Sequence, residues 1–322
     1  MKKFISLLLC LVLCFSLVGA AFAEGELKSV DEANLSSAFL TATLHVAKGV
    51  DFSSVKTLNY SFTAKPNESV PAADVVAIAD QPITLAPNPA GDDNLAKGKI
   101  SLASFLSASM FPHAGLYEYT VAQKDVSGLD ATYERFNKDK TLPTYDMKIQ
   151  VINDTTVTPA VLKIASVTVR LTGENNKQDL SENYDNTGFN FENWYEKIVE
   201  KTDGDGVLSV KKVISGTYAD STKTFEISVS IVLPDRTTAD DVAVTGATLS
   251  GTAPNLVATA NLKGGESIKF TKLPAGTSFS VTEQEDVAYK FKFTGDFTAE
   301  SGDNDYQAVS VAAGSKIGRA HV

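Results

Sequence analysis

Two lysines stand at the ends of alternating segments that are spelled almost alike. The first segment runs from Leu44 to Lys48 as LHVAK, and the second runs from Leu208 to Lys212 as LSVKK. Residues at every second position of a strand share one face, so the apolar positions direct Lys48 and Lys212 toward the core. An unpaired ammonium is too costly to bury. Each lysine is therefore expected to be paired, neutralised or consumed in a covalent bond.

The elements that must position these lysines are strands. Alternating segments bounded by Gly, Pro, Asn and Asp dominate the chain and predict an all-β fold, and many short strands with frequent turns favour β-sandwiches. Only Asp31 to Phe39 and Ser101 to Met110 could each form a short helix. The clearest strand signals are Thr57–Thr63, Leu116–Val121, Tyr145–Val151, Val161–Leu171, Thr224–Leu233, Ser267–Leu273 and Ser278–Thr282.

The first residues have the form of an export signal. Lys2 and Lys3 precede an apolar run from Phe4 to Val18, and the small-residue pattern Ala-Phe-Ala ends at Ala23, before Glu24. We therefore expect a signal peptide over residues 1–23 and a mature start at Glu24. The apolar run is too short for a confident membrane span and no second run appears, so the mature chain is expected to lack a membrane segment.

Cysteine usage and charge narrow the class of protein. Cys10 and Cys14 both lie in the signal peptide, so a secreted mature chain has no disulfide and must rely on core burial, metal or another cross-link. Removal of the signal takes the formal net charge from -10 to -12, which argues against nucleic acid as a partner. No Ser, Cys or His constellation indicates catalysis, and we expect neither a metal nor a cofactor.

About 300 mature residues are enough for two domains, each with its own core. The boundary is expected in the segment Lys201 to Gly206, which gives domains over 24–203 and 204–315. Glycine and aspartate favour a short turn there. The aspartates also suggest calcium, but the segment lacks the further ligands and terminal glutamate of a calcium loop, so a solvated linker is favoured.

Residues in the second half resemble a known family. The segment KGGESIKFTKLPAGTSFSVTE from Lys263 to Glu283, and the segment from Lys212 to Gly216, are similar to the second domain of major pilins from Gram-positive bacteria. The resemblance covers nearly all of the mature chain. It implies two tandem immunoglobulin-like sandwiches of the collagen-adhesin B type, each closed by an internal Lys–Asn isopeptide bond that forms without an enzyme and is promoted by a nearby acid.

The resemblance also implies roles for particular residues. In the first domain Lys48 matches the lysine of the first strand. The segment Phe191 to Tyr195 resembles the closing strand, whose asparagine Asn193 would be joined to Lys48. In the second domain Lys212 matches the lysine and Glu283 matches the promoting acid.

The first domain departs from the family pattern at the acid. The strand from Gly115 onward resembles the one that bears it, but the expected position is Gln123, which cannot donate and recover a proton as a carboxylic acid does. Either the Lys48–Asn193 bond forms slowly or not at all, or another acid such as Glu118 serves. Alternation places Glu118 on the opposite face from Gln123. The alternative is that Lys48 is hydrogen-bonded to amides.

The second domain departs from the family pattern at its end. The chain contains no acceptor asparagine for Lys212, and no sorting signal, hydrophobic segment or basic tail follows. Residues Lys316 to Val322 look like the translation of a sequencing adapter. We therefore expect that the reading frame was cut at about Ser315, before the last strand.

The function implied by the resemblance is structural rather than enzymatic: a shaft subunit of a sortase-assembled pilus on the cell wall of a Gram-positive bacterium, supporting adhesion. Its partners would be identical subunits, sortase and the cell wall. Polymerisation needs an exposed lysine in the first domain, and Lys177 in a polar loop is the candidate, although Lys197 and Lys201 are equally solvated. A non-polymerising wall-anchored adhesin or a tip pilin is the alternative, and a secreted hydrolase is a remote one.

Overall fold

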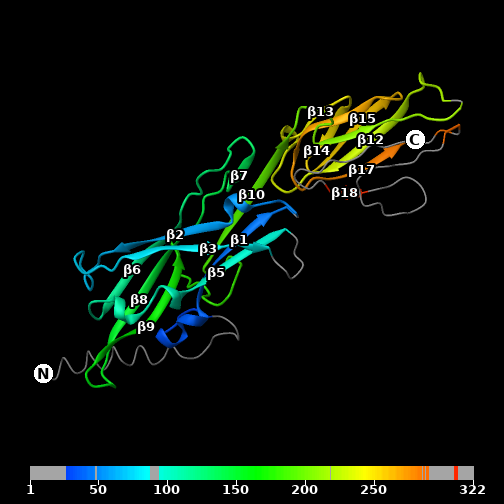
Figure 1. Cartoon of the computed structure of the whole chain (residues 1–322). Coiled ribbons are helices and arrows are strands. Elements are labelled where there is room, and N and C mark those ends of the chain that lie inside the picture. Colours follow the sequence, from blue (N-terminus) through cyan, green and yellow to red (C-terminus); the bar gives the residue numbers. More distant parts are fainter. Residues whose placement is uncertain are drawn as a thin grey trace.

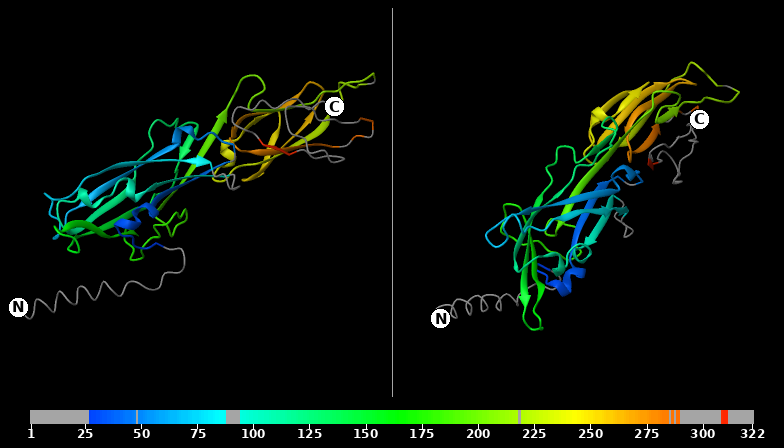
Figure 2. Two further views of the ribbon diagram at one scale, coloured as in Figure 1. Left: turned by 60° about the horizontal axis from the view of Figure 1, so that its bottom comes forward. Right: turned by 60° about the vertical axis from the view of Figure 1, so that its left-hand side comes forward.

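The structure is a computed structural model that contains two β-rich lobes arranged end to end (Figure 1), and the turned views in Figure 2 keep this arrangement. The all-β prediction is confirmed, because the only helices in the described residues are short 3-10 helices. The expected signal peptide (1–23), the mature start at Glu24, Lys48 and the tail (316–322) lie outside the described residues. The structure describes residues 27–47, 49–87, 94–217, 219–284, 286 and 288–289, and the backbone of 308–310.

The first lobe is built from the strands β1 to β10 and four 3-10 helices. The strands are β1 (Phe39–Val46), β2 (Thr57–Lys65), β3 (Ile78–Thr84), β4 (Ala86–Pro87), β5 (Leu95–Ser101), β6 (Gly115–Gln123), β7 (Glu134–Phe136), β8 (Thr144–Asp154), β9 (Val161–Leu171) and β10 (Asn190–Glu200). The helices are η1 (Glu32–Ser37), η2 (Ser53–Val55), η3 (Leu102–Ser104) and η4 (Ala108–Met110).

The second lobe is built from the strands β11 to β18 and one 3-10 helix. The strands are β11 (Leu208–Lys211), β12 (Phe225–Val232), β13 (Ala243–Thr245), β14 (Thr248–Thr252), β15 (Asn255–Leu262), β16 (Ser267–Pro274), β17 (Ser278–Glu283) and β18 (Ala308–Ser310). The helix is η5 (Ala239–Asp241).

Each lobe is a two-layer sandwich with its own buried cluster, and we call them the first and second domains. In the first domain one sheet has the order β3-β2-β6-β8-β9, and the facing sheet contains β4, β5, β1 and β10, with β7 at the side of β10. In the second domain the sheet β14-β15-β12-β17-β18 faces β11, β16 and β13. Alternating strands bury one face each, which is why two sheets stack over an apolar layer.

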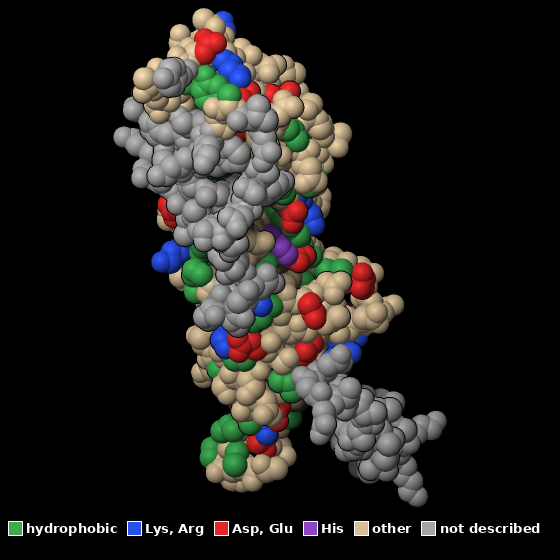
Figure 3. Space-filling view, turned by 90° about the vertical axis from the view of Figure 1, so that its right-hand side faces the viewer, with side chains coloured by type: hydrophobic (Ala, Val, Ile, Leu, Met, Phe, Trp, Pro, Cys, Tyr) green, Lys and Arg blue, Asp and Glu red, His purple; other side chains and the backbone are tan. Residues whose placement is uncertain are grey.

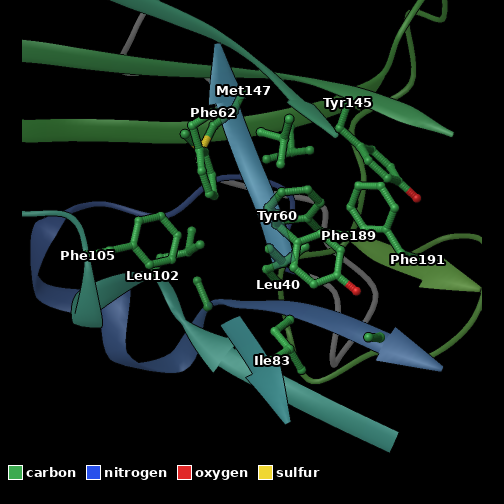
Figure 4. Packing of buried hydrophobic residues seen from close by; sticks show 14 of the residues in the cluster. Leu40, Tyr60, Phe62, Ile83, Leu102, Phe105, Tyr145, Met147, Phe189 and Phe191 are labelled. Atoms are coloured by element: carbon green, nitrogen blue, oxygen red, sulfur yellow. The ribbon is translucent and has the colours of Figure 1, made fainter. Parts of the chain in front are cut away.

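The first core is rich in aromatic side chains from both sheets (Figure 4). Tyr145 on β8 meets Phe189 and Phe191 edge-on, each with ring centroids 5.1 Å apart, and Tyr60 on β2 tilts against Phe191 at 4.8 Å. Such tilted and edge-on pairs suit the charge distribution of aromatic rings. The segment expected to close the first domain is therefore anchored by Phe191, which is fully buried.

The strand β10 belongs to both domains. Its first half pairs in parallel with β1, from Thr41 opposite Asn190 onward, and its last three residues pair with β16 of the second domain. The chain then makes a turn and enters β11, which pairs with the other half of β16. The boundary expected at 203/204 falls inside that turn, and the domains are joined by shared sheet hydrogen bonds rather than by a free tether.

A tight turn of the second domain also packs on the first. Ala275 lies in the turn between β16 and β17, yet it is buried in the core cluster of the first domain. A Cβ atom placed on Gly276, whose φ is +89°, would lie 2.4 Å from the Cβ of Ala47. The domains therefore approach so closely here that only glycine fits without displacement.

Surface features are otherwise mixed. On the face shown in Figure 3, acidic and basic side chains are interspersed, and hydrophobic side chains gather at the lower tip. The hairpin of β8 and β9 contributes the exposed apolar residues Ile152, Val157 and Val161. Within the described residues we find no helix with the length and apolar character needed to cross a bilayer.

The turn at Gly276 gives a testable stability difference. We expect Gly276→Ala to destabilise the protein by about 1–3 kcal/mol more than Gly265→Ala, because the added methyl must displace Ala47. Gly265 is a matched control: its φ is +94° and nothing lies within 4 Å of the added methyl. Urea unfolding of both variants measures the difference, and equal losses would contradict the packing described here.

Candidate functional site

A buried ion pair lies in the second domain. Lys212 is 1% exposed and follows directly on β11, and its Nζ donates to Oε1 of Glu283 at 2.6 Å. Glu283 is the last residue of β17 and is 9% exposed. The Nζ atom also lies 3.7 Å from the ring centroid of Phe225. The structure thus brings together the two residues that the resemblance singled out in this domain.

Backbone pairing fixes where these two side chains meet. The Lys212 N–H donates to the carbonyl of Glu266, and the Lys212 carbonyl accepts from the N–H of Gly265, so the lysine continues the β11–β16 ladder in an irregular form. Glu283 stands opposite Ile227 on β12, in the facing sheet. The pair therefore spans the sandwich from one layer to the other.

Burial makes the lysine chemically unusual. Desolvation lowers the pKa of Lys212 from its ordinary value, although the bond to Glu283 opposes this effect. Because the amine and the carboxyl share one short hydrogen bond, moving one proton along it turns the ion pair into a neutral amine and a carboxylic acid. A neutral amine is a nucleophile, so this geometry can support attack on an acyl carbon.

The corresponding place in the first domain contains amides. Asn193 on β10 is fully buried, and its Oδ1 accepts from Nε2 of Gln123 and from Nδ2 of Asn137, each at 2.7 Å. Its Nδ2 donates to the carbonyls of Thr43 and Phe191, at 3.3 and 3.0 Å. All four hydrogen-bonding positions of this buried amide are therefore filled.

Gln123 occupies the position of the expected acid and contacts the expected acceptor. Its Oε1 in turn accepts from the hydroxyl of the buried Tyr60 at 3.2 Å. Glu118 does not substitute for it, because its carboxylate accepts from Lys148 at 2.8 Å and lies on the outer face of β6, away from the buried Tyr117 and Tyr119. Within the described residues, an amide rather than an acid polarises the Asn193 carbonyl.

Asn137 is the residue that sequence reasoning missed. It follows β7 with a φ of 51°, and its backbone N–H donates to the carbonyl of Trp194 at 2.9 Å. Its Oδ1 accepts from the N–H of Trp194, also at 2.9 Å. An asparagine in a turn is the only signal of this contact in the sequence, and nothing there connects it with a strand 56 residues later.

The three lysines considered for polymerisation are all partly exposed. Lys177 follows a run of exposed residues, and its backbone forms a bridge with Arg170. Lys197 lies opposite Glu134 in the β7–β10 pair, and Lys201 begins the turn after β10. Exposure therefore does not select one of them.

The Asp-Gly segment between the domains forms a compact turn. Gly206 donates its N–H to the carbonyl of Asp203 at 3.1 Å, and Lys269 donates its Nζ to the carbonyl of Gly204 at 2.9 Å. In the part of the chain that the structure describes, no group of three or more His, Cys, Asp or Glu side chains is arranged to hold a metal ion. The positively charged ammonium group of Lys269 occupies this turn, where a metal ion would otherwise have to bind.

A cavity of about 280 Å³ lies at the junction of the two domains, lined by residues of both. Trp194 at its wall is covered by His45, stacked at 4.7 Å, and by Nζ of Lys140 at 3.5 Å. Glu196 and Arg236, which also line the cavity, are bonded to each other at 2.8 Å. Trp194, Glu196 and Arg236 in its wall are thus engaged with protein partners.

Comparisons with known proteins place these features in context. A family model described as a domain of unknown function (DUF7601) matches residues 206–317. No curated protein matches the chain. Among solved structures, a major pilin from Streptococcus pyogenes is 19% identical, with 77% of this chain and 83% of that chain covered and a TM-score of 0.35.

Two further solved structures are similar in the same range. The major pilin T3.2 from Streptococcus pyogenes is 17% identical, with 92% and 97% of the two chains covered and a TM-score of 0.36. A pilus-presented adhesin is 19% identical, with 55% of this chain and 34% of that chain covered and a TM-score of 0.25. These values do not assign the chain to a family.

The buried pair predicts a distinctive pattern of stability. We expect Lys212→Met or Glu283→Met alone to cost about 3–5 kcal/mol, because each leaves one buried charge without its partner. The double variant should cost far less than the sum, since no charge then remains buried. Urea unfolding of the whole chain measures these differences.

The exposed pair Lys124–Asp80 is the matched control, with side chains 52% and 46% exposed. There, Lys124→Met and Asp80→Met should each cost about 0–1 kcal/mol and add together. Additive losses at Lys212 and Glu283 would show that the two residues do not act as a pair.

Proposed function

We propose that the mature chain is a structural subunit of a sortase-assembled surface pilus, stabilised by Lys–Asn isopeptide bonds inside its domains. The single observation that carries the proposal is the buried Lys212–Glu283 pair, which spans the second sandwich at the end of its first strand. Burying a lysine that is 1% exposed beside a carboxyl in an apolar site costs desolvation free energy. A covalent reaction of this lysine would explain why the pair is buried.

The proposed reaction balances without any cofactor. The neutral Nζ of lysine attacks the side-chain carbonyl carbon of an asparagine, a C–N bond forms, and the asparagine nitrogen leaves as ammonia. The carboxyl of Glu283 donates a proton to the developing oxyanion and recovers it when the carbonyl reforms, and one proton of the attacking lysine nitrogen passes to the asparagine nitrogen, which leaves as ammonia. The reaction occurs once per molecule. In this proposal the acceptor asparagine for Lys212 lies outside the described residues.

The first domain would use Lys48 and Asn193 in the same way. Asn193 is positioned on β10 beside β1, the strand that precedes Lys48, so a bond would tie the first strand to the last. By the loop-entropy model, a cross-link across on the order of 100 residues stabilises by roughly 4–5 kcal/mol. Such a bond would compensate for the absence of cysteine from the mature chain. With Gln123 in place of an acid, the bond would form more slowly.

A secreted, wall-attached shaft subunit fits the other features. The two domains are arranged end to end, and β10 joins them through sheet hydrogen bonds (Figure 1). Tension along such a rod would pass through the proposed covalent ties. The partners in this proposal are identical subunits, a sortase and the cell wall. A non-polymerising adhesin or tip pilin would use the same domains without forming the polymer.

Intact mass tests the chemistry of the first domain. We expect the mature chain with Gln123→Glu to lose about 17 Da, one ammonia, because a carboxyl can then shuttle protons beside Asn193. The unchanged chain should lose it more slowly. Asn193→Ala in the Gln123→Glu background is the control and should retain the full mass. If the Gln123→Glu chain shows no loss of ammonia, the proposal of a Lys48–Asn193 bond is wrong.

Polymerisation tests the role in the shaft. We expect a complete reading frame, co-expressed with its sortase, to form ladders that resist sodium dodecyl sulfate, and Lys177→Arg to abolish them, because sortase joins the subunits through a lysine amine. Lys197→Arg and Lys201→Arg are the controls and should leave the ladders intact. Immunoblots of cell-wall extracts provide the measurement. Absence of any ladder would favour the adhesin or tip pilin.

A further inference from the structure

A short segment of the first domain is bonded to both domains at once. We call residues Glu134–Lys140 the latch segment. It begins with β7, which pairs with β10 through Tyr195, Glu196 and Lys197. Its later residues leave the sheet: the Lys138 carbonyl accepts from Arg236 of the second domain, and Nζ of Lys140 lies over the ring of Trp194.

The latch segment makes two ionic or polar contacts with the second domain. Arg135 forms a bidentate pair with Asp241, whose side chain is 3% exposed. Asp241 also accepts from the N–H of Thr238 at 2.9 Å and so caps its own helix η5. Arg236 donates to the carbonyl of Lys138 and, through Nε, to Glu196 at 2.8 Å. Bidentate Arg–carboxylate pairs are among the strongest and most directional polar contacts.

The same segment holds the buried amide of the first domain. Asn137 lies between Arg135 and Lys138 in the chain, and its Nδ2 donates to Oδ1 of Asn193 at 2.7 Å. It also exchanges two hydrogen bonds with Trp194, the residue after Asn193. One residue, Phe136, separates Arg135, which contacts Asp241, from Asn137, which contacts Asn193, so the two contacts cannot move far apart.

The backbone at this place is conformationally costly. The non-glycine residues with positive φ in the described parts of the chain are Asn137 at 51°, Asp139 at 60° and Arg236 at 66°. Two lie in the latch segment and the third binds it. Such conformations persist where surrounding contacts over-determine them, and they concentrate at functional positions. Here the contacts that hold them come from two different domains.

We propose that the latch segment couples the docking of the second domain to the closure of the first, with Asn137 as the positioning residue for Asn193. When Asp241 and Arg236 are in place, Arg135 and Lys138 are fixed, and Asn137 is held against Asn193 and Trp194. When the second domain is displaced, the costly backbone of the latch segment relaxes and these hydrogen bonds are lost. The coupling holds whether or not an isopeptide bond forms.

Hydrogen exchange in the whole chain tests the coupling. The variant Asp241→Asn removes the charge that holds Arg135 but keeps an oxygen that can cap η5. We expect the amides of Asn137 and Trp194 to exchange about tenfold faster, since their mutual hydrogen bonds open more often. The amide of Tyr119, in the centre of the β6–β8 pair, should be unchanged.

A control variant and the Tyr119 amide distinguish a local effect from a general one. Asp80→Asn makes the same charge change at an exposed pair of the first domain and should leave all three amides unchanged. Unchanged exchange at Trp194 in Asp241→Asn would overturn the proposal. Equal acceleration at Tyr119 would overturn it too, because the effect would then be global.

A double-mutant cycle separates coupling from two independent losses. Asn137→Ala removes the acceptor for the Trp194 N–H, so exchange at Trp194 should accelerate. Adding Asp241→Asn to that variant should then have no further effect at Trp194, because the path through Asn137 is already broken. If instead the two substitutions accelerate exchange at Trp194 independently, so that their factors multiply, Asp241 does not act through the latch segment and the proposal fails.

Discussion

The hydrogen bonds of β10 are the constraint on which the rest of the molecule depends. This strand closes the sheet of the first domain beside β1 and then begins the sheet of the second domain beside β16. Its side chains supply the aromatic anchor Phe191 and the buried amide Asn193. Because one strand pairs with β1 in the first domain and with β16 in the second, pulling the domains apart requires breaking backbone hydrogen bonds of β10.

The two domains solve the same problem of a buried polar centre in different ways. In the second domain Lys212 and Glu283 form a charged pair, whose burial is costly unless the partners remain together. In the first domain Gln123, Asn137 and Asn193 form an uncharged cluster with every position of the Asn193 amide filled. An uncharged, saturated cluster is cheaper to bury, and it is also less reactive, because no group in it can readily release a proton.

Alternation in the sequence predicts much of this architecture. The segments around Tyr145, Val161 and Thr224 are strands as expected, and the turn after Leu273 joins β16 to β17. The expected helices are instead short 3-10 helices, which begin at the N-caps Asp31 and Ser101 and end at Ala38 and Phe105. The meeting of Lys212 with Glu283 follows from the resemblance. The contacts of Asn137 and Arg135 could not be predicted, because neither leaves a periodic signal in a single sequence. Asn137 meets a strand 56 residues later in the same domain, and the contact of Arg135 with Asp241 depends on the relative placement of two domains.

The compact Asp-Gly turn between β10 and β11 holds several residues within a short distance. The N–H groups on either side of it, at Lys201 and Val207, donate to the adjacent residues Thr271 and Phe270 of the same strand. The five residues between them thus add almost nothing to the end-to-end distance of the molecule. In a stretched molecule, these residues could extend by about 17 Å, at roughly 3.4 Å per residue, once the pairing of Ile198–Glu200 with β16 is lost. The junction would then yield by a fixed increment while both sandwiches remain folded.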